Sequence, residues 1–126
     1  MFKLLLIGAG GFLGAIFRYL LSGAVHQIMA ARLGFPYGTL VVNIAGCFLI
    51  GLFGGLAESR QLFNPEVRLV VFIGLLGGFT TFSTFAYESF SLGRDGELIA
   101  LLLNVFLHLF LGLIAVWLGH ILSRIL

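Results

Sequence analysis

Hydrophobic residues in this chain occur in four long blocks separated by short polar segments. Three of the blocks are uncharged runs of 25, 19 and 26 residues, bounded by Arg32 and Glu58, Arg68 and Glu88, and Glu97 and Arg124. The fourth begins at Lys3 and contains one charge, Arg18. A membrane-spanning helix needs about 20 mostly apolar residues. We therefore predict four transmembrane helices, over residues 3–24, 36–57, 67–90 and 98–123.

Composition supports a single transmembrane domain over residues 1–126. Hydrophobic residues make up 60% of the chain and charged residues 10%, which leaves too little polar surface for a water-soluble globule. A membrane β-barrel is excluded because stretches such as 98–103 do not alternate between apolar and polar residues. We expect an all-α membrane protein that is not an enzyme, since no nucleophile–base pair or carboxylate dyad occurs. The net charge of +2 does not indicate nucleic-acid binding.

The positive charges between the blocks predict only a weak orientation. If the N-terminus is cytoplasmic, that side holds Lys3, Arg60, Arg68 and Arg124, and the other side holds Arg32 and Arg94. Positive residues favour the cytoplasmic side of short loops. Four against two is compatible with a modest preference for a cytoplasmic N-terminus or with insertion in both orientations.

Glycines in the first block resemble a nucleotide-binding turn, but that interpretation fails. Such a turn needs an acidic residue about 20 positions later, and the first acidic residue is Glu58. The 18 glycines indicate close helix packing instead, because small residues four apart let helix backbones touch in lipid. The pairs at this spacing are Gly10 and Gly14, Gly51 and Gly55, and Gly74 and Gly78.

Two polar residues within the first two spans are candidates for function. Arg18 shares a helix face with Gly10 and Gly14, and a charge in mid-span costs at least about 2.5–3.5 kcal/mol. It either extends to the interface or places a positive charge at a pore mouth. Asn43 shares a face with Thr39. Its amide is either a link between helices or a hydrogen-bond donor to a substrate.

The third block contains the densest polar motif, Gly-Gly-Phe-Thr-Thr-Phe-Ser-Thr-Phe over residues 77–85. Glycine is a poor helix former, and Thr and Ser hydroxyls compete for backbone hydrogen bonds. We expect a helix broken in mid-membrane, which is tolerated only where it is buried in protein or lines a cavity. Its carbonyls and hydroxyls could hold Na⁺. The alternative is a kinked helix whose hydroxyls bond back by one turn.

Three further polar residues lie in the last two spans. Glu88 ends the uncharged run and either sits at the interface or faces a water-filled vestibule. Asn104 and His108 fall on one stripe of the fourth helix with Gly112. We expect them to line a polar path or an interface and not to face lipid.

The motif at 77–85 resembles the Fluc/CrcB family of fluoride channels. Two further segments carry the resemblance, which runs from about residue 8 to 88: Gly-Ala-Ile-Phe-Arg-Tyr over 14–19 and Pro-Tyr-Gly-Thr-Leu-Val-Val-Asn over 36–43. The resemblance implies a passive fluoride-selective channel that exports fluoride and lowers its toxic level. It also implies a dual-topology homodimer of antiparallel subunits in the bilayer of the bacterial inner membrane.

The resemblance also implies roles for individual residues. Main-chain carbonyls of Gly77 and Thr80 would hold one structural, untransported Na⁺ at the dimer centre. The positions implied to line the fluoride pore are Phe82, Phe85, Asn43, Thr39, Ser83 and Thr84. Those implied for the vestibule and polar track are Arg18, Glu88, Asn104 and His108. Members of the family often carry Tyr or Ser hydroxyls on the fourth helix, so His108 raises the question of pH-dependent conduction.

Two other interpretations remain at this stage. A four-helix drug/proton exchanger needs a membrane-embedded carboxylate, for which Glu88 is the only candidate within a span. A purely structural membrane subunit would explain the glycines but not Arg18, Asn43 and the hydroxyl cluster together.

Overall fold

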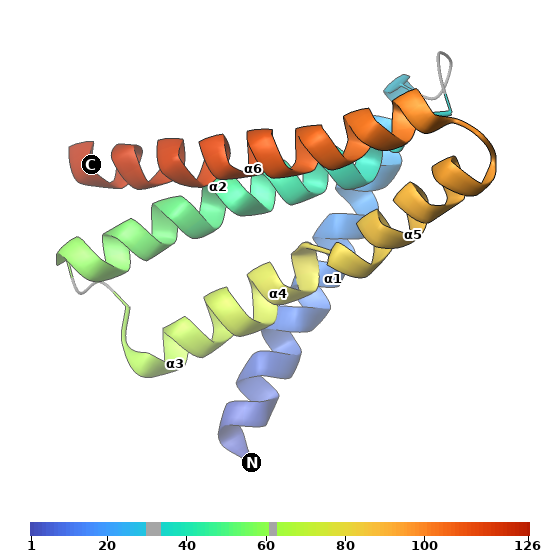
Figure 1. Cartoon of the computed structure of the whole chain (residues 1–126). Coiled ribbons are helices and arrows are strands. Elements are labelled where there is room, and N and C mark those ends of the chain that lie inside the picture. Colours follow the sequence, from blue (N-terminus) through green and yellow to red (C-terminus); the bar gives the residue numbers. More distant parts are fainter. Residues whose placement is uncertain (30–33, 61–62) are drawn as a thin grey trace.

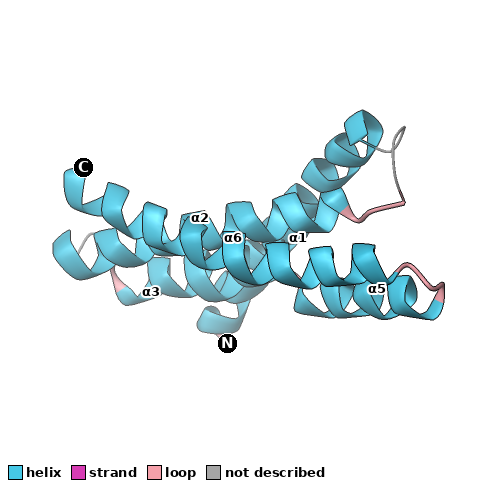
Figure 2. Cartoon of the chain, turned by 45° about the horizontal axis from the view of Figure 1, so that its top comes forward, coloured by secondary structure: helices cyan, strands magenta, loops and turns pink. Residues whose placement is uncertain are grey.

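The computed structural model describes residues 1–29, 34–60 and 63–126, and their regular structure is entirely helical (Figure 2). The helices are α1 (Phe2–Met29), α2 (Tyr37–Arg60), α3 (Pro65–Arg68), η1 (Leu69–Leu76), α4 (Gly77–Phe79), α5 (Phe82–Arg94) and α6 (Leu98–Ile125). Four stretches are long and apolar enough to cross a membrane: Phe2–Met29, Tyr37–Ser59, Pro65–Arg94 and Leu98–Ile125. The α3, η1, α4 and α5 segments together form the third of these.

The observed helices extend beyond the predicted spans. The first helix continues past residue 24 to Met29, because a single glycine does not end a helix and no proline follows before Met29. The third begins at Pro65, where the Asn64 side chain caps it by accepting a 2.8 Å hydrogen bond from the Val67 amide. It ends at Arg94, before Gly96 at φ 82°. Arg32 lies outside the described residues.

A π-helical segment, η1, lies within the third span. Its hydrogen bonds join residues five apart, so its turns are wider than those of an α-helix. The charge gaps and motifs of the sequence did not predict it. Because each π turn holds extra backbone, η1 changes the direction in which the following residues of α4 face.

The helices pack as two parallel pairs (Figure 1). Helix α6 lies along α2, with Gly51 against Val116 and Gly119 against Phe48. Helix α1 crosses η1 and α4 obliquely while running in the same direction (Figure 1), with Gly10 against Gly74. The glycine contacts predicted from the sequence are confirmed in both pairs, since a Cβ at these positions would overlap the backbone of the neighbouring helix.

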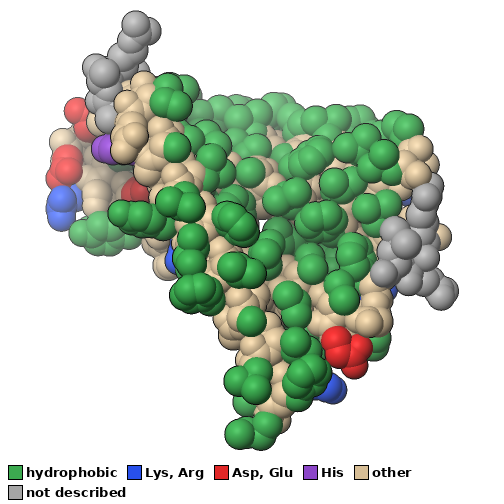
Figure 3. All heavy atoms as spheres, turned by 180° about the vertical axis from the view of Figure 1, so that it is seen from behind, with side chains coloured by type: hydrophobic (Ala, Val, Ile, Leu, Met, Phe, Trp, Pro, Cys, Tyr) green, Lys and Arg blue, Asp and Glu red, His purple; other side chains and the backbone are tan. Residues whose placement is uncertain are grey.

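Few side chains are fully buried in the single chain. The fully buried side chains include Val42, Asn104 and Ser123. Hydrophobic side chains cover most of the face in Figure 3, and charged side chains lie toward its ends. This distribution suits a surface that faces lipid or another membrane-embedded protein rather than water.

Candidate functional site

The third span is interrupted at two residues, Thr80 and Thr81. Helix α4 ends at Phe79, Thr80 has φ −82° and ψ 158°, Thr81 has φ −151° and ψ 106°, and α5 begins at Phe82. Thr81 caps α5, because its Oγ1 accepts a 3.2 Å hydrogen bond from the Thr84 amide. The same hydroxyl donates to Thr84 Oγ1 at 2.8 Å. Its side chain therefore replaces backbone partners that a continuous helix would supply.

Asn43 of α2 holds this interruption in place with both ends of its amide. Its Nδ2 donates to the Thr81 carbonyl at 3.1 Å, and its Oδ1 accepts from the Thr81 amide at 2.8 Å. The amide is therefore a link between helices, the first of the two alternatives that the sequence left open. An Asn Nδ2 carries two N–H groups, so one donor remains for a further partner.

The link to Asn43 leaves the Gly77 carbonyl without its usual partner. In a continuous helix the Thr81 amide would bond to that carbonyl, but here it donates to Asn43. Thr80 continues to bond back, with its amide and its hydroxyl both donating to the Leu76 carbonyl at 3.0 Å. Gly77 is exposed on the single chain, so its carbonyl lies near the surface of the protomer.

Two phenylalanines lie directly after the interruption. Phe82 and Phe85 have ring centroids 5.5 Å apart, with ring planes inclined by 56°. Phe82 is 79% exposed on the single chain, whereas Phe85 is half-buried beside His108 of α6, with ring centroids 4.3 Å apart. Both line a cavity of about 370 Å³. The more polar residues that line the same cavity are Asn43, Cys47, Thr80, Thr81 and His108.

A second cavity, of about 470 Å³, lies on the other side of Thr81. The polar residues that line it include Arg18, Ser22, His26, Thr39, Thr81, Thr84 and Glu88. Arg18 thus faces a cavity shared with a carboxylate and several hydroxyls. Because Thr81 lines both cavities, it is the point at which they approach each other.

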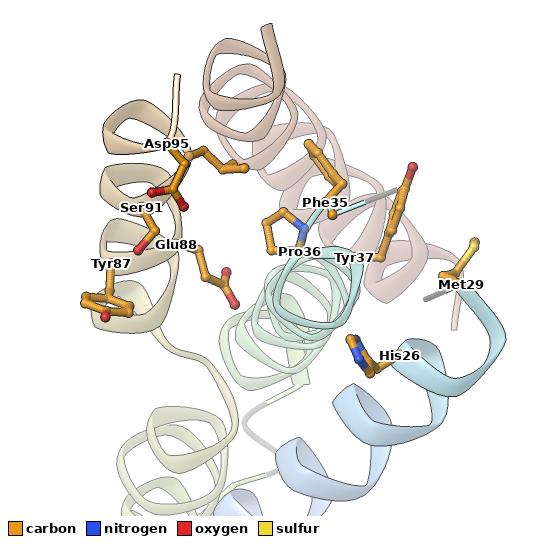
Figure 4. A pocket seen from close by; sticks show the side chains of 11 residues that line it. His26, Met29, Phe35, Pro36, Tyr37, Tyr87, Glu88, Ser91 and Asp95 are labelled. Carbon is orange, nitrogen blue, oxygen red and sulfur yellow. The ribbon is translucent and has the colours of Figure 1, made fainter. Parts of the chain in front are cut away.

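Glu88 also faces a neighbouring hollow at the end of the molecule. This cavity of about 460 Å³ lies between α1, α2 and α5, and Figure 4 shows Glu88 pointing into it from α5. Thr39 Oγ1 donates to Glu88 Oε1 at 2.6 Å. The other carboxylate oxygen, Oε2, is buried and has no hydrogen-bond partner among the described residues. One oxygen of the carboxylate is thus hydrogen-bonded to α2, and the other is buried without a hydrogen-bond partner among the described residues.

The polar residues of α6 form a buried link to α5. Asn104 is fully buried, and its Nδ2 donates to Ser89 Oγ at 3.0 Å. His108 Nδ1 lies 2.9 Å from the Asn104 carbonyl oxygen. Asn104 and Gly112 are buried and His108 is half-buried. The prediction that this stripe of α6 faces other parts of the protein is therefore confirmed.

The structure brings most of the candidate residues into two groups. Gly77, Thr80, Asn43, Phe82, Phe85 and His108 line the first cavity, and Arg18, Thr39, Thr84 and Glu88 line the second. Ser83 and Asn104 line neither of these two cavities. Ser83 is exposed, and its Oγ is 3.4 Å from Thr81 Oγ1.

The sequence-based set omitted two residues that the structure places at the site. Thr81 lines both cavities, and the signal that could have identified it is that Thr is a favoured residue at a helix N-cap. Ser89 bonds to Asn104, and it lies one helical turn after Phe85. No local pattern identifies Ser89, because its partner is on another helix.

Comparison with known proteins identifies the family of this chain. The family model described as CrcB-like protein, Camphor Resistance (CrcB), matches residues 5–120. A protein of Methanosarcina acetivorans named fluoride-specific ion channel FluC 1 is 49% identical over 96% of this chain and 90% of its own length. Proteins named fluoride-specific ion channel FluC are 46% identical in Geobacter sulfurreducens, over 98% of both chains, and 45% identical in Chlorobium phaeobacteroides, over 97% and 93%.

The similarity and the four apolar helices indicate a multi-pass membrane protein. The family consists of ion channels, which are not enzymes. On the evidence of a model match over most of its length and of relatives nearly half identical to it, this chain belongs to the CrcB family of FluC-type ion channels.

Proposed function

We propose that this protein is a passive channel selective for fluoride, which exports the ion from the cytoplasm across the bacterial inner membrane and so lowers its toxic level. The observation that carries the proposal is the near-complete alignment with relatives named fluoride-specific ion channels. Flow down a gradient needs no catalytic group, only a path with suitable hydrogen-bond donors.

The two cavities on either side of Thr81 supply such a path. Fluoride enters the wider cavity beside Arg18, where the fixed positive charge attracts it. It then passes the hydroxyls of Thr39 and Thr84 and reaches the cavity lined by Asn43, Phe82 and Phe85. Ser83 adds a hydroxyl on the exposed side of the same junction.

Fluoride must lose water along this path without being trapped. The second N–H of the Asn43 amide and the hydroxyl proton of Thr84, whose oxygen accepts from Thr81, replace part of its hydration shell. The positive edges of Phe82 and Phe85 offer weaker contacts, from which the ion can leave. Selectivity therefore comes from a narrow path with a few donors, as in other channels. Asn104 and His108 belong to the wall behind Phe85.

A second copy of the chain, inserted antiparallel, completes the walls of each path. The 79% exposure of Phe82 supports this part of the proposal, because a pore-lining ring needs a covering surface. The weak charge bias of the loops supports insertion in both orientations. We propose a homodimer with the third spans of the two subunits crossing in mid-membrane, so that the interruption at Thr80 and Thr81 lies at the centre.

The same interruption fits a structural Na⁺ bound by the carbonyls of Gly77 and Thr80. A hard cation takes oxygen ligands, and unwound backbone in membranes can supply them. The Gly77 carbonyl suits this role because the Thr81 amide is bonded to Asn43 instead. When bound, Na⁺ supplies a positive charge in a region of low dielectric, where a bound ion is often the largest local charge.

Efflux from liposomes that contain the purified protein tests the proposal. A fluoride electrode and a chloride electrode record the loss of each ion after a potassium ionophore is added. We expect rapid fluoride loss without chloride loss. Folded protein that releases neither ion would disprove the channel, and transport of a lipophilic cation driven by a proton gradient would favour an exchanger instead.

A further inference from the structure

The imidazole of His108 is held in one orientation at the wall of the Phe82 and Phe85 cavity. The acceptor 2.9 Å from its Nδ1 is the backbone carbonyl of Asn104. A carbonyl can only accept a hydrogen bond, so Nδ1 carries the proton. The ring also packs against Phe85, with centroids 4.3 Å apart and planes inclined by 39°. Both contacts determine which way the other ring nitrogen faces.

That other nitrogen, Nε2, is buried and has no hydrogen-bond partner among the described residues. With Nδ1 protonated, neutral imidazole has a lone pair at Nε2, whereas the imidazolium has an N–H donor there. A lone pair repels an anion in the cavity, and a charged N–H attracts one. Leaving a buried polar atom unpaired costs free energy. Packing alone therefore does not account for a histidine at this position.

Other ionisable groups around the imidazole do not provide an alternative partner. Cys47 of α2 lines the same cavity but is not hydrogen-bonded to His108. The lining residues from η1 and α4 are Phe72, Leu76 and Gly77, and those from α5 are Phe82 and Phe85, none of which is ionisable. Glu88, one turn after Phe85 on α5, bonds to Thr39 and lines the cavities on the other side of Thr81. Neither Gly77 nor Thr80 is a hydrogen-bond or ring partner of His108.

We propose that His108 places a proton-dependent positive charge at the wall of this cavity, so that fluoride occupies the Phe82 and Phe85 cavity more readily when Nε2 is protonated. This inference rests on the proposed fluoride conduction. Binding and protonation at such a site are reciprocal: the proton favours the anion, and the anion favours the proton by the same factor. Fluoride flux through the protein therefore increases as the pH falls through the range in which His108 titrates.

The main experiment measures fluoride efflux from liposomes at two pH values, one about one unit above and the other about two units below 6.5, the ordinary value for imidazole. Protein-free liposomes at each pH correct for leakage of hydrogen fluoride. We expect the corrected flux to be at least about twofold higher at the lower pH, and this increase to be absent in His108→Gln. His120→Gln is the matched control, because His120 is on the same helix and does not line the cavity; it should keep the increase.

A second measurement needs no substitution and remains valid if His108→Gln fails to fold. Nitrogen NMR of imidazole-labelled protein in liposomes reports the protonated fraction of His108 at one fixed pH. Replacing gluconate with fluoride should increase that fraction, whereas the signal of His120, which lines neither cavity, should not change.

The outcomes separate this inference from the function on which it rests. Fluoride-selective flux that does not increase at lower pH, with a His108 signal that does not respond to fluoride, overturns the role of His108 and leaves the channel intact. Absence of fluoride flux at both pH values overturns the channel, and the inference with it.

Discussion

Thr39 donates a 2.6 Å hydrogen bond to Glu88 across 49 positions of the chain, and this bond joins the first turn of α2 to α5. Both residues line the cavity that contains Arg18. The bond therefore fixes the position of a carboxylate at the entrance of the proposed path.

Replacing Thr39 with Val should destabilise the protein. Val has nearly the same shape but no donor, so Glu88 loses the only hydrogen bond that the described residues give its carboxylate. Hydrogen bonds to charged groups contribute about 1.5–3 kcal/mol, and we expect a loss of that size in the free energy of unfolding. Denaturant unfolding in detergent measures it.

Two further variants make this prediction specific. Thr39→Ser keeps the hydroxyl and should retain most of the stability. In a double-mutant cycle with Glu88→Leu, which removes the acceptor, the two changes should be non-additive, because the residues are in contact. Additive effects would contradict a direct energetic link between them.

Replacing Asn43 with Ala should impair both folding and conduction. The change leaves the amide and carbonyl of Thr81 without the partners that Asn43 provides, at about 1–3 kcal/mol for each buried group. We expect fluoride flux to fall at least about tenfold, which corresponds to about 1.4 kcal/mol in the barrier. Liposome efflux normalised to folded protein measures the effect.

Asn64→Ala is the matched control for Asn43→Ala. Asn64 caps the third span from an exposed position, so its loss should cost about 1 kcal/mol in stability without a comparable change in flux. If both variants reduce flux equally, general destabilisation explains the effect and Asn43 has no special place in the path.

Replacing Gly14 with Ala should separate α1 from the third span. A Cβ at Gly14 would overlap the Leu75 carbonyl oxygen and lie 2.8 Å from the Phe79 amide nitrogen. These are backbone atoms and cannot rotate away, so we expect a loss of about 1–3 kcal/mol, as for other overpacked sites. Thermal unfolding monitored by circular dichroism measures the change.

Gly8→Ala provides the comparison on the same helix. A Cβ at Gly8 would meet no atom within 4 Å, and Ala is the better helix former. The Gly8 variant should be as stable as the natural chain or slightly more stable. Equal losses for the two variants would indicate that glycine has a role other than close packing in α1.

Replacing Phe85 with Ala should reduce fluoride flux at least about tenfold, since the change removes a ring edge from the proposed path and the ring beside His108. Phe82→Ala should have a similar effect. Phe90→Ala is the control, because Phe90 is 65% exposed on the same helix and lines neither cavity. Unchanged efflux in both Phe82→Ala and Phe85→Ala would contradict the ring-edge mechanism.

Much of the architecture was predictable because membrane helices leave strong local signals. Charge gaps located three of the four spans and a hydrophobic block with one charge located the first, and glycine spacing identified the surfaces of Gly10, Gly14, Gly51 and Gly55 that contact other helices. Helix ends were less accurate, since the first helix continues past residue 24 to Met29 and the Asn64 cap was not used. A charge gap marks the apolar stretch, whereas capping determines where the helix starts.

Partners distant in sequence could not be predicted in the same way. The motif identified Thr80 and Thr84 as polar residues, but the attachment of Thr81 to Asn43 depends on how α2 packs beside the third span. The Ser89–Asn104 bond likewise depends on the relative position of α5 and α6. The π-helical turns of η1 arise from backbone geometry, for which side-chain spacing gives no simple signal.

The parallel pairing of the helices has a consequence for the order of assembly. Helices that run in the same direction are never consecutive in a chain that crosses the membrane back and forth. The surface of α1 around Gly10 and Gly14 therefore has no partner until the third span has been inserted, and α2 waits similarly for α6. During synthesis, the first two helices must remain in the bilayer with their closest packing surfaces uncovered, so completion of the fold depends on the second half of the chain.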